Sequence, residues 1–152
     1  MAPWSAPSHL LLGNWCPRAD RADPIALLQT QEAQRISWLV PVRHARMAQN
    51  PFAYYRGAPV VMAADLGTAP SSGLEVQLCG DAHLFNFGFY ASPERALLFD
   101  INDFDETARG PFEWDVKRLV ASLVIAARSL GLPPSWQERI ARRAARAYRK
   151  AI

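Results

Sequence analysis

Apolar side chains and helix-start signals predict helices in residues 23–67. Asp23-Pro24 is a typical helix start, an N-cap aspartate followed by proline in the first helical position, and the helix must end before Pro41. Residues 41–50 predict a short basic helix or turn. Asn50-Pro51 breaks it, because the residue before a proline avoids the helical region. Residues 60–67 predict a buried helix, so we expect a helical N-terminal layer.

The pattern then changes to the alternation that is typical of strands. Residues 74–79 alternate apolar and polar side chains and predict a first strand. Residues 85–90 and 96–101 predict two further strands, which a turn at 91–94 joins into an antiparallel hairpin. The composition of residues 107–110 predicts a loop.

Helical spacing returns after residue 110. Pro111 is expected to open an amphipathic helix that ends at Gly131. Its apolar stripe comprises Phe112, Val116, Leu119, Val120, Leu123, Val124 and Ala127. Ser135 and Glu138 have the spacing of a capping box, which predicts a second helix over 136–150. The predicted fold is therefore α+β, with a helical N-terminal layer, a small antiparallel hairpin sheet and a C-terminal helical hairpin.

Length and composition are those of one globular domain. The chain has 152 residues, of which half are hydrophobic and a fifth are charged. Residues 1–22 are rich in proline and lack a period, so they predict a loose leader ahead of a single domain over 23–152. Because no stop signal follows the last helix, we expect this domain to be truncated. Two cysteines do not make a disulfide framework, and neither a signal peptide nor a membrane span is recognisable, so we expect a cytoplasmic protein.

The net charge of +3 is mild but uneven. The last predicted helix gathers most of the basic side chains, namely Arg139, Arg142, Arg143, Arg146, Arg149 and Lys150. Such a run can bind nucleic acid, but a solvated helix face is its more ordinary use. Nucleic acid is therefore not expected among the partners.

Oxygen-bearing side chains gather at two points where predicted strands end. Asp81 and Asn86 lie five residues apart after the first strand. The end of the hairpin adds Asp100, Asp103, Asp105 and Glu106. Carboxylate and amide oxygens are the ligands that Mg²⁺ prefers, and bound Mg²⁺ commonly carries phosphate. The two segments predict a metal and phosphate site; the alternative is that these acids only cap turns and helices.

Other polar side chains have two interpretations each. His83 either touches phosphate or is a structural histidine within its loop. Asp115 either supports the loop or caps the helix that starts near Pro111. A basic group around residue 50 either binds an acidic group of a substrate or pairs with acids in the core; it comprises Arg43, His44, Arg46 and Arg56. Lys117 and Arg118 lie on a solvated helix face or contact phosphate.

The segment around Asp81 resembles the catalytic loop of kinases. Protein kinases use an aspartate and an asparagine five residues apart, the first for the acceptor hydroxyl and the second for Mg²⁺. Aminoglycoside phosphotransferase-type kinases have His-Gly-Asp-x-His-x-x-Asn, a hairpin and then Asp-aromatic-acid. Cys79 to Asn86 and Asp103-Phe104-Asp105 follow this order. The resemblance implies a fold similar to a kinase C-lobe, with Asp81 and His83 at the reaction and Asn86, Asp103 and Asp105 holding Mg²⁺.

A third stretch extends the resemblance. Gly110 to Asp115 is similar to the Gly-Asp-Pro-x-x-Asp-Leu segment of those kinases, whose aspartate braces the catalytic loop, and this implies the same role for Asp115. Arg43, Arg56 and Lys117 are then the candidates for contacts to the phosphates of ATP. No Gly-x-Gly-x-x-Gly and no Val-Ala-Ile-Lys stretch is present to cover a nucleotide.

Most of the chain also resembles a bacterial family known as domain of unknown function 2252. The similarity extends over residues 36–150, with matching stretches at 40–43, 46–47, 51–57, 62–66, 77–88, 99–107 and 110–119. Members of that family are usually much longer. The resemblance implies that a glycine-rich stretch and a lysine-bearing strand follow this region, which would make the present chain the catalytic half.

The sequence therefore predicts a fragment of a kinase-like phosphotransferase that uses Mg²⁺ and ATP on a hydroxyl acceptor, with a small molecule favoured. A pseudokinase-like binding module is the alternative, because the glycine loop and the lysine are missing. A metal-dependent phosphohydrolase is a third hypothesis, since it would use the same carboxylates with water as the nucleophile.

Overall fold

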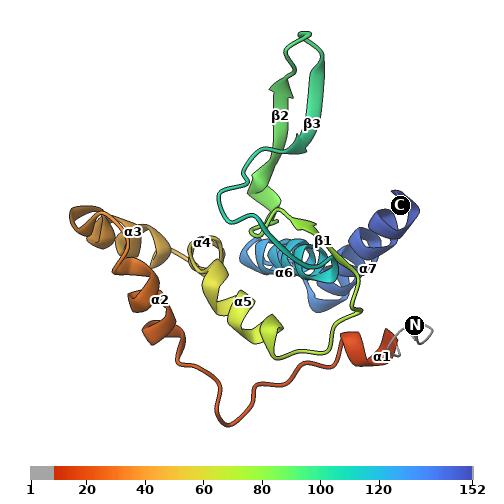
Figure 1. Ribbon diagram of the computed structural model, residues 1–152. Helices are drawn as coiled ribbons and strands as arrows, with labels where there is room; N and C mark the ends of the chain where they lie inside the picture. The colour runs from red at the N-terminus through yellow and green to blue at the C-terminus, as the bar shows by residue number, and fades with distance from the viewer. Residues whose placement is uncertain (1–8, 152) are drawn as a thin grey trace, which may run out of the picture.

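Helices form most of the N-terminal half of this computed structural model, which describes residues 9–151. The helices before the first strand are α1 (His9–Leu12), α2 (Pro24–Glu32), α3 (Val40–Met47), α4 (Pro51–Gly57) and α5 (Pro59–Gly67), with a 3₁₀ turn, η1, at Ser37–Leu39. Figure 1 shows α2 and α3 on one side of the molecule, and α4 and α5 leading from them toward the centre. The predicted helical layer is thus confirmed.

Local capping explains where these helices begin. The Asp23 carboxylate accepts hydrogen bonds from the backbone N–H groups of Ile25 and Ala26, as expected of an N-cap. The Asn50 side chain accepts one from Ala53 at 2.8 Å, so the residue that ends the preceding segment also starts α4. A small apolar cluster lies between α2, α3 and α5 and is centred on Leu28, Met47 and Ala58.

Residues 1–8 of the predicted leader lie outside the described residues. The part from Gly13 to Asp23 has neither helix nor strand. Near its end, the Arg21 guanidinium donates two hydrogen bonds to the Asp65 carboxylate on α5, at 2.7 and 2.8 Å. This ion pair ties that end of the segment to the helical layer.

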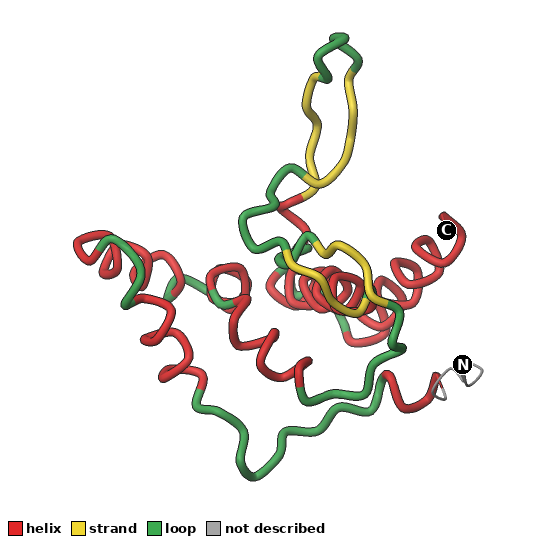
Figure 2. The backbone as a smooth tube through the Cα atoms, in the orientation of Figure 1, coloured by secondary structure: helices red, strands yellow, loops and turns green. Residues whose placement is uncertain are grey.

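The strands form two separate antiparallel pairs. β1 (Glu75–Leu78) pairs with β4 (Ala108–Pro111), and β2 (Phe87–Ala91) pairs with β3 (Leu97–Ile101). Figure 2 shows the longer pair standing away from the body of the molecule and the shorter pair lying on it. The hairpin is confirmed, although a 3₁₀ turn, η2 (Leu84–Asn86), occupies the predicted start of its first strand.

The loop predicted at residues 107–110 is wrong, because this segment is strand β4. Its sequence, Ala-Arg-Gly-Pro, has little strand propensity. The segment is extended because its backbone pairs with β1, in the register Val76 opposite Gly110. A methyl group in place of the Gly110 hydrogen would lie 2.8 Å from Cδ1 of Leu78, so a larger residue there would have to displace the end of that leucine side chain.

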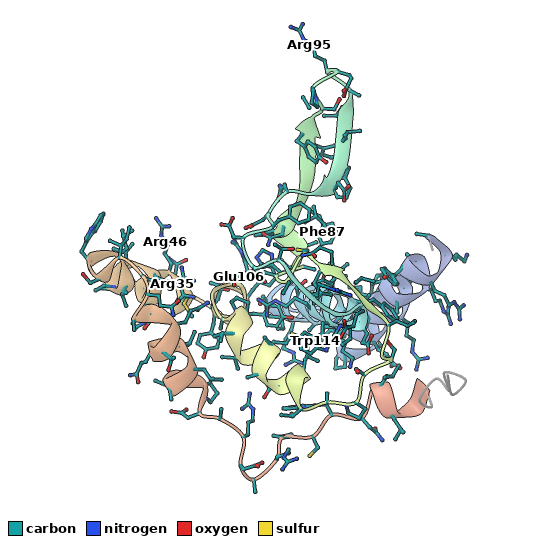
Figure 3. The ribbon with its side chains drawn as sticks, viewed as in Figure 1. Arg35, Arg46, Phe87, Arg95, Glu106 and Trp114 are labelled. Carbon is teal, nitrogen blue, oxygen red and sulfur yellow. The ribbon has the colours of Figure 1, made fainter. Side chains whose placement is uncertain are left out.

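One face of the β2–β3 hairpin is apolar along its whole length. The cross-strand pairs on this face are Phe87 with Ile101, Phe89 with Phe99, and Ala91 with Leu97. Phe89 and Phe99 pack with their ring centroids 4.9 Å apart. Phe89 nevertheless remains 72% exposed and Leu97 74% exposed. Arg95 adopts a left-handed backbone (φ 64°) at the hairpin tip, which Figure 3 marks at the far end.

The C-terminal helical hairpin is also confirmed. It consists of α6 (Glu113–Ser129) and α7 (Pro134–Ala151). Gly131, with φ +71°, ends α6: its N–H donates to the carbonyl of Arg128, and the next N–H, of Leu132, donates to that of Ala127. Within residues 9–151, no helix has both the length and the apolar character that crossing a membrane requires.

The predicted starts of the two C-terminal helices, α6 and α7, are each wrong by two residues. Pro111 belongs to β4, and α6 begins only at Glu113, because the strand pairing holds the preceding backbone extended. The second helix begins at Pro134, so Ser135 lies inside its first turn instead of capping it. Proline suits this first position because its missing N–H would have no partner there.

Gly80 lets two polar segments meet. Its backbone has φ +90°, and a methyl group here would lie 1.8 Å from the carbonyl oxygen of Glu106. The segment that follows the hairpin therefore crosses directly beside the end of β1. The Thr107 hydroxyl, which donates to the carbonyl of Leu78 at 2.6 Å, holds it there.

We predict that Gly80→Ala lowers the free energy of unfolding by more than about 2 kcal/mol, since it adds both backbone strain and a clash with a carbonyl. Urea titration measures this. Gly67→Ala is the matched control, because nothing lies within 4 Å of the added methyl group at the end of α5. It should leave stability unchanged or raise it by less than about 1 kcal/mol. Equal midpoints for the two variants would contradict the close crossing.

Candidate functional site

One face of α6 holds the segment between β1 and β2, which we call the Asp81 loop (residues 79–86). Asp115, Arg118 and Ser122 follow each other at helical spacing and each binds this loop. The Asp115 carboxylate accepts from the backbone N–H groups of Cys79 and Gly80, at 2.7 and 3.1 Å. The Ser122 hydroxyl, which is fully buried, accepts from the N–H of Leu84 at 2.9 Å. The loop is thus fixed at both ends by side chains of a single helix.

Arg118 fixes the middle of the loop. Its Nε and Nη2 atoms contact Oδ1 of Asp81 at 2.8 and 2.7 Å, and Nη2 also donates to the backbone carbonyl of Tyr55 at 2.7 Å. The guanidinium lies over the Tyr55 ring, 3.9 Å from its centroid. Arg118 is only 3% exposed, so its predicted position on a solvated helix face is wrong. The ion pair with Asp81 offsets the cost of burying its charge.

Tyr55 completes this buried network. Its hydroxyl donates to the carbonyl of Arg118 at 2.9 Å. Burial, only partly opposed by the charge of Arg118, raises the pKa of Tyr55 to about 12, so its hydroxyl stays protonated as a donor at neutral pH. α4, α6 and the Asp81 loop are therefore joined through three polar side chains.

The Asp81 loop also bonds to itself. The Asn86 amide nitrogen donates to the backbone carbonyl of Asp81 at 2.8 Å. The backbone N–H of Asn86 donates to the carbonyl of His83 at 2.9 Å, and the carbonyl of Asn86 accepts from Asn102 at 3.0 Å. The five-residue spacing thus closes a tight turn, in which the carboxamide oxygen of Asn86 accepts no hydrogen bond from the described residues.

His83 is buried within the loop, at 3% exposure. Its Nδ1 accepts from the N–H of Phe85 at 3.1 Å, which leaves the ring proton on Nε2, 3.6 Å from Oδ2 of Asp81. Burial lowers the pKa of His83, the negative charge of Asp81 raises it, and the positive charges of Arg56 and Arg118 lower it further. The ring is therefore neutral near pH 7, held by the loop and facing Asp81.

A cavity of about 910 Å³ opens in front of this loop. Six of the nine predicted site residues line it together: Arg43, Arg56, Asp81, His83 and Asn86, and Asp103 from the segment after the hairpin. Arg35 and Arg46 also line it. Figure 3 shows these two on the helical side of the molecule and Glu106 on the segment that faces them.

The other predicted site residues lie elsewhere. Asp105 is exposed and does not line the cavity. Lys117 is half-buried on α6 and does not line it either. Asp115 lies behind the loop, where burial raises the pKa of its carboxyl and the two backbone N–H donors oppose that shift. From there Asp115 can hold the backbone of the Asp81 loop in place without contacting a ligand in the cavity.

Four arginines make the helical side of the cavity positive, and we call them the arginine wall (Arg35, Arg43, Arg46 and Arg56). Arg43 pairs with Glu32 at 3.1 Å and also donates to the carbonyl of Gly57. Arg35 lies 4.0 Å from Glu106. Arg56 lies over the Phe85 ring, 5.1 Å from its centroid. Arg46 and Arg56 form no ion pair with any described residue.

The acidic side of the cavity offers oxygen ligands for a metal ion, but too few to complete its coordination shell. Among the residues that the structure describes, no three His, Cys, Asp or Glu side chains are close enough to hold a metal ion together. Asn86 and Asp103 line the same cavity, however. Mg²⁺ is commonly held by one or two carboxylates, with water and substrate phosphates completing its shell. The residues present therefore fit a Mg²⁺ ion that arrives with a phosphate ligand.

Apart from Asp115, sequence reasoning missed the residues that position the loop and the segment before it. Glu113, also buried, accepts from the backbone N–H and the hydroxyl of Ser72 and anchors the segment before β1. Asp115, Arg118 and Ser122 leave a signal in the sequence, because they form a polar stripe at helical spacing along one face of α6. Tyr55 leaves no such signal.

These features define an α+β protein with an open polar cavity, lined by arginines on one side and by an Asp-Asn loop on the other. Residues 35–152 match the family described as "Uncharacterized protein conserved in bacteria (DUF2252)", and the chain belongs to this family. No curated protein and no solved structure matches the chain. The resemblance to this family is thus confirmed, and its description names no activity.

We predict that the His83 ring titrates below its unfolded-state value of about 6.5. Because the lowered pKa disfavours the protonated ring in the folded state, the stability that neutral His83 contributes is complete above about pH 6.5. It is lost as the pH falls from there through the folded-state pKa. Proton NMR of the ring signals measures the titration, and His9→Gln and His44→Gln identify the signals of the other two histidines. Asp81→Asn should lower the pKa of His83 further, since it removes the one nearby negative charge. A titration at or above 6.5 would contradict the buried, neutral ring.

Proposed function

We propose that the cavity is a phosphotransfer site that uses Mg²⁺-ATP on the hydroxyl group of a small molecule. The observation that carries this proposal is the convergence of Asp81, Asn86 and Asp103, which come from two separate segments, on one cavity with a positive opposite side. Asp-to-Asn spacing of five after a strand, followed by a hairpin and another aspartate, is the order used by kinase-like enzymes.

Each residue has a role that its position allows. Oδ1 of Asp81 is held by Arg118, so Oδ2 is the atom that can orient an acceptor hydroxyl and receive its proton. His83 faces this same oxygen and limits its motion. Asp115 holds the backbone at the start of the loop. With the loop fixed in this way, most of the rate gain would come from positioning.

Mg²⁺ and ATP would be held jointly. The carboxamide oxygen of Asn86 and the carboxylate of Asp103 would bind the ion, and the nucleotide phosphates would complete its shell. When bound, Mg²⁺ neutralises charge on the transferred phosphoryl group. This proposal makes the chain the catalytic half of a kinase-like protein.

A second candidate is a pseudokinase-like module that binds the same ligand and transfers nothing. Two observations favour it: one oxygen of Asp81 is engaged by Arg118, and the described residues hold no cluster of three acidic, histidine or cysteine side chains. Phosphate release from Mg²⁺-ATP without an acceptor would instead favour the phosphohydrolase hypothesis.

We predict that Asp103→Asn weakens the binding of Mg²⁺-ATP about tenfold or more, because it replaces a charged metal ligand with a neutral amide. Isothermal titration calorimetry measures this. Asp105→Asn is the matched control: it changes the same charge two residues away, on a side chain outside the cavity. It should bind as the wild type does.

Two results would contradict the proposal. Absence of saturable heat with the wild-type chain would contradict the binding of Mg²⁺-ATP by this chain, and equal weakening by both variants would point to a general charge effect. If Mg²⁺-ATP binds as predicted, a screen of hydroxyl acceptors for ADP production then separates the enzyme from the binding module.

A further inference from the structure

The arginine wall has more positive charge than the neighbouring acids can balance. Of its four members, Arg43 is paired with Glu32, and Arg35 is near Glu106 at 4.0 Å. Arg46 and Arg56 have no acidic partner among the described residues, although both line the cavity. On the other side, Asp81 is matched by Arg118. Two guanidinium groups therefore remain against the single carboxylate of Asp103.

These two arginines come from separate helices and reach the same space. Arg46 lies in the last turn of α3, and Arg56 lies in the last turn of α4. The Arg56 guanidinium lies over the ring of Phe85, a residue of the Asp81 loop, 5.1 Å from its centroid. The planar guanidinium group of arginine is suited to paired hydrogen bonds with phosphate oxygens.

We propose that Arg46 and Arg56 form an anion subsite that binds a phosphate dianion carried by the acceptor substrate. This rests on the proposed function in one respect, since it assigns the anion to the acceptor and not to the nucleotide. In the phosphotransfer site, Asp103 is used by Mg²⁺, which leaves both arginines available for a second ligand. The acceptor is then a phosphorylated small molecule that also presents a hydroxyl group to Asp81.

The test uses inorganic phosphate as the probe and phosphorus NMR as the measurement. In EDTA, with no metal or nucleotide present, the full chain should shift and broaden the phosphate signal in a saturable way. Arg46→Gln and Arg56→Gln should each weaken binding about tenfold, since each removes a charge-assisted contact. Arg95→Gln, at the hairpin tip, removes the same charge far from the cavity and should bind as the wild type does. Circular dichroism checks that each variant is folded.

Two further binding measurements distinguish a failure of the anion subsite from a failure of the proposed function. Asp103→Asn should bind phosphate in EDTA at least as tightly as wild type, although its binding of Mg²⁺-ATP is weakened about tenfold or more. Addition of Mg²⁺-ATP to wild-type protein should leave phosphate bound, because the two ligands occupy different parts of the cavity. If the nucleotide fails to bind while phosphate binds through both arginines, the proposed function fails and the anion subsite stands.

Three results would overturn the subsite. Absence of saturable binding in EDTA would remove it. Equal binding by wild type, Arg46→Gln and Arg56→Gln would show that phosphate binds elsewhere. Displacement of phosphate by Mg²⁺-ATP would assign these arginines to the nucleotide.

Discussion

The buried ion pair between Arg118 and Asp81 is the contact on which the rest of the site depends. Arg118 is nearly inaccessible to water, and its guanidinium joins the Asp81 loop on one side to the backbone and ring of Tyr55 on the other. Removing one member of a buried pair costs about 3–5 kcal/mol, because the remaining charge is left without a partner. The intact pair adds little net stability compared with apolar side chains. Its contribution is to fix where Asp81 lies.

The geometry of the cavity follows from this constraint. α6 supplies three polar side chains at helical spacing, and each holds a different part of the Asp81 loop: Asp115 at its start, Arg118 at its middle and Ser122 near its end. Gly80 then allows the segment after the hairpin to cross beside β1, which brings Asp103 to the same cavity as Asp81 and Asn86. Three of the four wall arginines, Arg43 and Arg46 on α3 and Arg56 on α4, face this loop because Tyr55, on α4, is tied to Arg118.

Much of this arrangement can be predicted from local sequence patterns, and the failures have a common physical cause. Asp23 before Pro24, alternation over 74–79 and glycine at 131 are signals that neighbouring residues alone produce, and the structure has all three features. β4 could not be predicted, because Ala-Arg-Gly-Pro becomes a strand only through its pairing with β1. Arg118 was misplaced for a related reason: its burial depends on a carboxylate 37 residues away.

In the candidate site, too, some features follow from neighbouring residues in the sequence and others from contacts between distant segments. The Asp81 and Asn86 spacing identifies the loop, and the structure places both residues, with Asp103, at one cavity. The choice between Asp103 and Asp105 is not determined by spacing, since the two lie only two residues apart in the same segment. The positive side of the cavity depends on packing between α3, α4 and the loop, which local patterns do not report.

A double-mutant cycle on Asp81 and Arg118 tests the central claim most directly. Urea unfolding would be measured for wild type, Asp81→Asn, Arg118→Met and the double variant. If the pair fixes the loop as described, each single change is strongly destabilising and the second change costs much less than it does alone, with a coupling energy of at least about 2 kcal/mol. Additive effects, within about 0.5 kcal/mol, would contradict this account of how the loop is held.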